Sequence, residues 1–152
     1  MSFPSLPVRH LFVSSAGECL PACAMMVLDY LGVQVSYARL LRILNVVPDL
    51  GAPSFNVRNL NQLGVKVEYG QGTLSTLRKH VEHGRPPIVF VRTGELPYWQ
   101  TNIEHAVVVI GVSDTQVLVD DPAFAAAPFV VSTGDFDLAW LDRDEYFAVI
   151  YR

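Results

Sequence analysis

The pattern of apolar positions predicts two helices near the start of the chain. Residues 19–32 contain mainly Ala, Met, Val and Leu with few charges, which is typical of a buried helix. Pro21 fits the first helical turn, and Gly32 stands where a C-terminal cap is expected. Ser36 is a suitable N-cap for a second, shorter helix over 37–44.

Later segments predict more helices and a sheet. The further helical segments are 54–63, 74–83 (with Thr73 as its cap and Gly84 as its terminator) and 134–141. The strand segments are 65–69, 87–91, 105–112, 116–121, 129–132 and 146–151. Helices come first and a mainly antiparallel sheet follows, which is an α+β order. No linker divides the chain, so we expect one domain spanning residues 1–152.

Composition and charge exclude several classes of protein. Of the 152 residues, 51% are hydrophobic and 17% charged, so the chain can bury a sizeable core. The net charge is −4 and no basic cluster occurs, which argues against nucleic-acid binding. The first ten residues lack the apolar core of a signal peptide, and apolar runs such as 106–112 are too short to span a bilayer. We therefore expect a cytoplasmic protein with no membrane segment.

Cys19 is the first candidate for chemistry. It opens the predicted helix over 19–32, and the free N–H groups and positive dipole end of a helix N-terminus favour a thiolate. The same N–H groups can face an oxyanion. A small buried apolar residue is the competing interpretation, and for an isolated cysteine it is the commoner case. Cys19 and Cys23 are the only cysteines and give no sign of a disulfide framework.

His105 and Asp121 are the candidate partners of that thiol. His105 begins the most hydrophobic strand, and Asp121 ends the next strand, just before Pro122. A hairpin with its turn at 113–115 would bring these two strand ends together. The carboxylate would then accept the Nδ1–H and leave Nε2 as the base. Alternatively, His105 is a solvent-facing strand end and Asp121 a turn residue before proline. Asp120 should lie on the opposite face of its strand.

The sequence resembles a known family at these motifs. ECLPACAMMVLDYLG (18–32) is similar to the nucleophile helix of the bacteriocin-processing papain-like peptidases, the double-glycine leader peptidases found fused to ABC exporters and as stand-alone proteins. ELPYWQTNIEHAVVVIGVSDTQVLVDDP (95–122) is similar to their histidine strand, turn and Asp-Pro ending. The resemblance implies a papain-like α+β fold and a cysteine peptidase, with Cys19 as nucleophile, His105 as base and Asp121 as the third member.

Two positions depart from the family's pattern. Leu20 follows the cysteine where the family usually has glycine, and Val13 stands where a glutamine usually donates to the oxyanion. Ser14, Ser15 or the backbone N–H of Cys19 are the candidate replacements. Because a missing oxyanion donor typically costs about 10²–10³ in rate, we expect a reactive Cys19 but slow cleavage of generic peptides.

The remaining candidates have more than one interpretation. Tyr98 and Trp99 either line a substrate groove or cover the sheet, and Cys23 is expected to be buried in the core and to bind no metal. We expect no cofactor and a peptide or protein substrate, with a separate transporter chain as a candidate partner. The alternatives to a peptidase are a catalytically weak or inactive domain that binds a peptide, and an acyl transferase that uses the same three residues.

Overall fold

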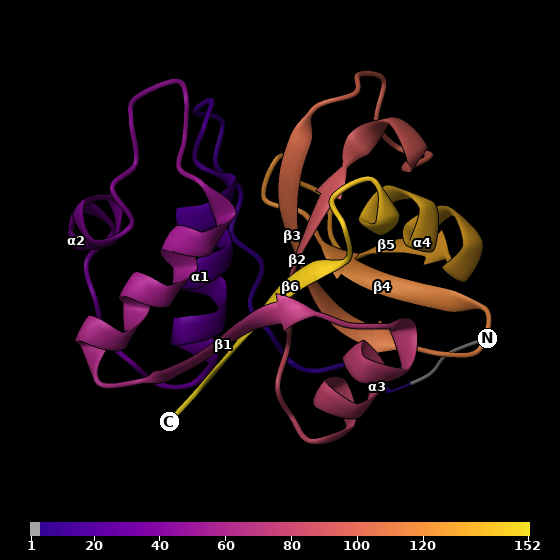
Figure 1. Ribbon diagram of the computed structural model, residues 1–152, viewed down its shortest axis with the longest axis horizontal. Helices are drawn as coiled ribbons and strands as arrows, with labels where there is room; N and C mark the ends of the chain where they lie inside the picture. Colours follow the sequence, from indigo (N-terminus) through magenta and orange to yellow (C-terminus); the bar gives the residue numbers. More distant parts are fainter. Residues whose placement is uncertain (1–3) are drawn as a thin grey trace.

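The computed structural model describes residues 4–152 and has helices on both faces of a six-stranded sheet (Figure 1). The helical elements are α1 (Cys19–Tyr30), α2 (Tyr37–Ile43), the 3₁₀ helices η1 (Ser54–Leu63) and η2 (Thr93–Glu95), α3 (Leu74–Glu82) and α4 (Thr133–Leu141). The strands are β1 (Lys66–Gln71), β2 (Ile88–Arg92), β3 (Glu104–Val112), β4 (Gln116–Asp120), β5 (Phe129–Ser132) and β6 (Tyr146–Tyr151). The order across the sheet is β1-β6-β2-β3-β4-β5, and every pairing is antiparallel. The predicted α+β fold is therefore confirmed.

Two apolar cores form because successive strand residues point to opposite faces of the sheet. On one face, Phe90, Ala106 and Val108 pack with α1, α2 and η1. On the other face, Val107 and Val109 belong to a core that contains α3 and α4. The sheet thus separates α1 and α2 from α4, as Figure 1 shows.

Short-range signals locate most helix ends. Gly32 has a left-handed φ of +75° just after α1, and the hydroxyl of Ser36 accepts from the N–H of Arg39 at the start of α2. Thr73 and Thr76 form a reciprocal capping box at the start of α3. The segment 54–63 is helical as predicted, but it is a 3₁₀ helix, and η2 was not predicted.

The N-terminal segment crosses the ends of β3 and β4 before it enters α1. The N–H of Leu6 donates to the Ile110 carbonyl at 2.8 Å, and that of Val13 donates to the Pro122 carbonyl at 2.9 Å. His10 Nε2 lies 2.8 Å from the Asp121 carbonyl oxygen, to which it donates. These bonds position the residues that lead into Cys19.

A close approach of two glycines holds this segment against a neighbouring loop. Gly17 has φ +79°, and a Cβ there would lie 2.7 Å from the backbone nitrogen of Gly51. Only glycine fits both the conformation and the contact. The loop around Asp49–Gly51 is thereby placed beside the start of α1.

Asp120 is a buried carboxyl with an incomplete set of partners. It is 2% exposed, and its Oδ2 has no hydrogen-bond partner among residues 4–152. Burial raises its pKa from 3.8 to about 6, although the positive charge of His10 acts in the opposite direction. The folded state therefore binds the Asp120 proton more tightly than the unfolded chain does. The free energy of unfolding has its full value below about pH 4, and part of it is lost as the pH rises through about 6.

We therefore predict that Asp120→Asn stabilises the protein at pH 7.5 by up to about 2–3 kcal/mol. At pH 4, where the wild-type carboxyl is already protonated, the gain should be small. Thermal unfolding of both proteins at the two pH values measures this difference. Asp142→Asn, at an exposed position, is the matched control and should change stability little at either pH. Equal gains at pH 4 and pH 7.5 would contradict the assignment to ionisation.

Among residues 4–152, no helix is long and apolar enough to cross a membrane.

Candidate active site

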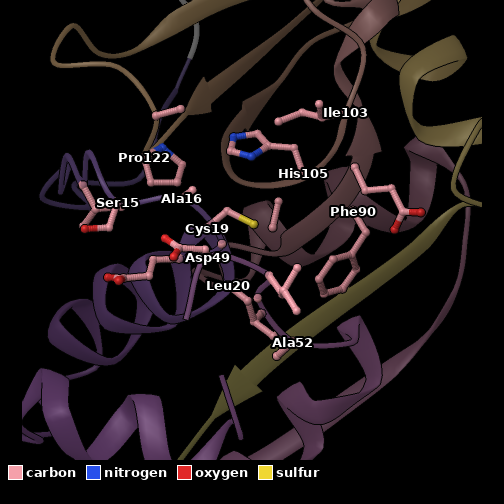
Figure 2. A pocket seen from close by; sticks show the side chains of 18 of the residues that line it. Ser15, Ala16, Cys19, Leu20, Asp49, Ala52, Phe90, Ile103, His105 and Pro122 are labelled. Atoms are coloured by element: carbon pink, nitrogen blue, oxygen red, sulfur yellow. The ribbon is translucent and has the colours of Figure 1, made fainter. Parts of the chain in front are cut away.

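Cys19 is the first residue of α1 and is half-buried. Its thiol lies close enough to His105, and to the backbone N–H groups of Ala106 and Leu20, for each of them to lower its pKa. Figure 2 shows the Cys19 sulfur and the imidazole of His105 facing one another across the cavity between helix and sheet. The sequence-predicted nucleophile and base therefore lie together.

His105 lies near the start of β3 and is only 5% exposed. Its Nε2 is 2.7 Å from Oδ1 of Asp121. The expected tautomer was the reverse, with Nδ1 on the carboxylate. Because Nε2 is taken by Asp121, Nδ1 is the nitrogen left for Cys19. Strand positions place the two residues together but do not specify which ring nitrogen meets the carboxylate.

Asp121 follows β4 directly and is completely buried. Each of its two carboxylate oxygens accepts two hydrogen bonds. Oδ1 accepts from His105 and from the N–H of Ala123 at 2.9 Å. Oδ2 accepts from the Tyr98 hydroxyl at 2.8 Å and from Trp99 Nε1 at 2.9 Å. A buried carboxylate needs this many donors to remain ionised.

Asp120 points away from the imidazole. It pairs with Val108, whose side chain packs in the core with α1. Residues opposite each other in a strand pair share a face, so Asp120 faces the α1 side of the sheet. As predicted from strand alternation, Asp120 lies on the opposite face from Asp121, and Asp121 is the residue that contacts His105.

The electrostatics favour an ion pair between Cys19 and His105. Burial alone would raise the pKa of Cys19, but the hydrogen bond and charge of His105, with the backbone donors, lower it below its ordinary value. Burial opposes protonation of His105, but the bonds to Asp121 and Cys19 raise its pKa to about 9. Burial likewise acts to raise the pKa of Asp121, and His105 and the other donors bring it below its ordinary value. All three shifts act in the direction of the thiolate–imidazolium pair beside an ionised carboxylate.

A cavity of about 670 Å³ opens over these side chains, and Figure 2 shows it from close by. Its wall includes the segment before Cys19, the loop near Gly51 and the start of β3. The side chains that line it include Val13, Ser14, Ser15, Leu20, Phe90, Trp99 and Ile103. The wall is mostly apolar, and its size suits a segment of peptide chain.

The oxyanion candidates all lie at this cavity. Ser14 and Ser15 are exposed and line it. Val13 lines it too, but its N–H is already bonded to Pro122 and its side chain has no donor. The backbone N–H of Cys19 is at the first position of α1, where no intrahelical acceptor exists.

The two aromatic candidates differ in their relation to the cavity. Trp99 lines it, whereas Tyr98 is not among the described residues that do so. Both donate to Asp121, a role that the sequence analysis missed because these residues precede Asp121 by 22 and 23 positions. No short-range signal in the sequence links them to it. The contacts of His10 and Ala106 were missed for the same reason.

Cys23 is completely buried in the core beneath Cys19. Burial, together with the neighbouring negative charges, raises the pKa of its thiol well above the ordinary value. Within residues 4–152 no group of three or more His, Cys, Asp and Glu side chains is arranged to hold a metal ion.

Residues 6–144 match the sequence model of the Peptidase_C39 like family. The chain belongs to this family. No protein with a curated description matches it in sequence.

Several solved structures of C39 peptidases share the fold. A Bacillus anthracis protein assigned as a C39-like peptidase is 17% identical, with a TM-score of 0.81 over 99% of this chain and 98% of its own. The double glycine motif protease of an AMS/PCAT transporter, solved with its leader peptide, is 18% identical, with a TM-score of 0.74 over 99% and 96%. The peptidase domain of Streptococcus ComA, a bi-functional ABC transporter, is 21% identical, with a TM-score of 0.74 over 95% and 98%. The match confirms the papain-like C39 peptidase fold.

The contact with His105 predicts an unusually reactive Cys19. At pH 6 we expect iodoacetamide to alkylate it at least roughly tenfold faster than a cysteine in the unfolded chain, because more of it is thiolate. His105→Ala should abolish most of this difference. Mass spectrometry of the alkylated peptide over time gives the rate at each position.

Cys23→Ala is the matched control, since it removes the other thiol and leaves the Cys19 contacts in place. Its Cys19 should react as fast as in the wild type. A Cys19 that reacts at pH 6 like an ordinary thiol would show that no thiolate–imidazolium pair forms.

Proposed function

We propose that this protein is a cysteine peptidase in which Cys19 is the nucleophile, His105 the acid and base, and Asp121 the residue that orients the imidazole. The observation that carries the proposal is that the Cys19 thiol faces His105, which is hydrogen-bonded to Asp121, at a cavity large enough for a peptide. Membership of a peptidase family supports the same reaction.

The first half of the reaction forms a thioester. The Cys19 thiolate attacks the carbonyl carbon of the scissile bond, so that an S–C bond forms and the carbonyl electron pair moves to oxygen. The resulting oxyanion lies near the N-terminus of α1, with the Cys19 N–H and the Ser14 and Ser15 hydroxyls as candidate donors. As the C–N bond breaks, the His105 imidazolium gives its Nδ1 proton to the leaving amine.

The second half releases the acyl group. Neutral His105 takes a proton from water, and the hydroxide oxygen attacks the thioester carbon. The C–S bond breaks, the product leaves as a carboxylic acid, and the thiolate–imidazolium pair is restored. Throughout, the Asp121 carboxylate holds Nε2–H and keeps the ring in one orientation.

The substrate we propose is a peptide or protein. The AMS/PCAT protease was solved with a leader peptide, so a peptide with a double-glycine leader is the first substrate to test. A cytoplasmic location and a separate transporter partner belong to the same proposal.

The proposal predicts cleavage that depends on all three side chains. Peptides of double-glycine leader sequence and a mixed peptide library would be incubated with the protein and analysed by mass spectrometry. Cys19→Ala should abolish cleavage, and His105→Ala should lower it by about 10²–10⁴-fold. Cys23→Ala should retain it. Full activity of Cys19→Ala would refute the proposal.

Because the Val13 side chain has no hydrogen-bond donor for the oxyanion, we predict that the wild-type protein cleaves peptides more slowly than a variant with a donor at this position. Val13→Gln supplies an amide at the cavity wall, and we expect kcat to rise by about tenfold or more, up to the roughly 10²–10³ that one oxyanion donor is worth. Val130→Gln, at an exposed position on β5, is the control and should leave kcat unchanged. If Val13→Gln folds normally and kcat does not rise, then another donor already serves the oxyanion, and Ser14→Ala and Ser15→Ala should identify it.

A further inference from the structure

Asp121 is held on two sides by different groups. Oδ1 accepts from His105 and one backbone N–H, whereas the donors to Oδ2 within residues 4–152 are the Tyr98 hydroxyl and the Trp99 indole N–H. Two consecutive side chains thus cap the oxygen that does not face the imidazole. All the donors are neutral except the imidazolium itself.

The loop that carries Tyr98 and Trp99 is fixed by its own bonds. The buried Thr93 hydroxyl donates to the Thr101 carbonyl at 2.6 Å and accepts from the Ile103 N–H at 2.9 Å. Inside this closed loop, the N–H of Trp99 donates to the Leu96 carbonyl at 3.1 Å. The two aromatic side chains therefore enter the site from a constrained backbone.

Aromatic packing fixes the rings themselves. Tyr98 stacks on Phe129 at 3.9 Å between centroids with an interplanar angle of 4°. Trp99 contacts His105 edge to face at 4.9 Å and Phe124 at 5.2 Å. The hydroxyl and the indole N–H are consequently aimed at Oδ2 without a large loss of side-chain freedom when the site forms.

We propose that Tyr98 and Trp99 are positioning residues that set the basicity of the Asp121 carboxylate, and through it the proton affinity of His105. Their donated hydrogens bring positive partial charge to Oδ2 and disperse the negative charge. A less basic carboxylate orients the imidazolium without taking its proton. This inference rests on the proposed function, but it concerns a proton equilibrium that is measurable without any substrate.

The other titratable groups around this centre are few. Cys19 and Cys23 come from α1, His10 bonds the Asp121 carbonyl from the N-terminal segment, Asp120 precedes Asp121, and Glu104 precedes His105. None of them lies on Oδ2, so removing a donor there leaves them in place.

The test is Tyr98→Phe, which deletes one hydroxyl and keeps the stacked ring. The pKa of His105 would be measured by NMR titration of its imidazole signals, assigned by their absence in His105→Gln. We expect it to rise by about half a unit, or roughly threefold in the protonation constant, because the carboxylate loses a donor and attracts the imidazolium more strongly. Trp99→Phe should shift it in the same direction.

Tyr30→Phe is the matched control, since it also deletes a half-buried tyrosine hydroxyl, one that donates to the Gly84 carbonyl away from the site. It should leave the His105 titration unchanged. An unchanged or lowered pKa in folded Tyr98→Phe would overturn the proposal, and Tyr98→Phe decides the matter if Trp99→Phe does not fold. If the proposed peptidase function is wrong, different measurements show it: Cys19 of the wild type reacts like an ordinary thiol, and the wild type cleaves no peptide.

Discussion

The buried Asp121 carboxylate is the constraint around which the site is built, since an ionised group with no exposure to water is unstable unless protein donors replace its hydration. Those donors come from separated parts of the chain. β3 contributes His105, the loop before β3 contributes Tyr98 and Trp99, and the turn after β4 contributes the Ala123 N–H. Each segment must therefore be in place for the buried charge to be stable.

The sheet places the His105 end of this network beside the Cys19 thiol. β3 packs against α1 through the core that includes Ala106, which sets the helix N-terminus beside the start of the strand. The helix end supplies free N–H groups and a favourable dipole, and the strand supplies the imidazole. A cleft at the border of helix and sheet is the consequence, and it is where a peptide can reach the sulfur.

The neighbouring aspartates illustrate how strongly environment decides the role of a carboxyl. Asp121 has four donors and a lowered pKa. Asp120, one position earlier and also buried, has a raised pKa and an oxygen with no hydrogen-bond partner in the described part of the chain, residues 4–152. The alternation of a strand sends the two side chains to different layers. The donors around Asp121 stabilise its negative charge, whereas ionisation of Asp120 in the core is unfavourable.

Many of the helices and strands could be predicted from short stretches of the sequence. The helix over 19–30 with its capping glycine, the capped helices after Ser36 and Thr73, and the strand segments all follow from periodicity and end signals, which depend on a few adjacent residues. The hairpin also makes the pairing of His105 with Asp121 predictable, because its turn is short. The 3₁₀ geometry of 54–63 and the ring orientation of His105 were decided by packing. Packing also decided which groups donate to Asp121 Oδ2 and how the His10 contact holds the N-terminal segment. These contacts join residues about 20 to more than 100 positions apart, and only the tertiary fold brings such groups within hydrogen-bonding distance.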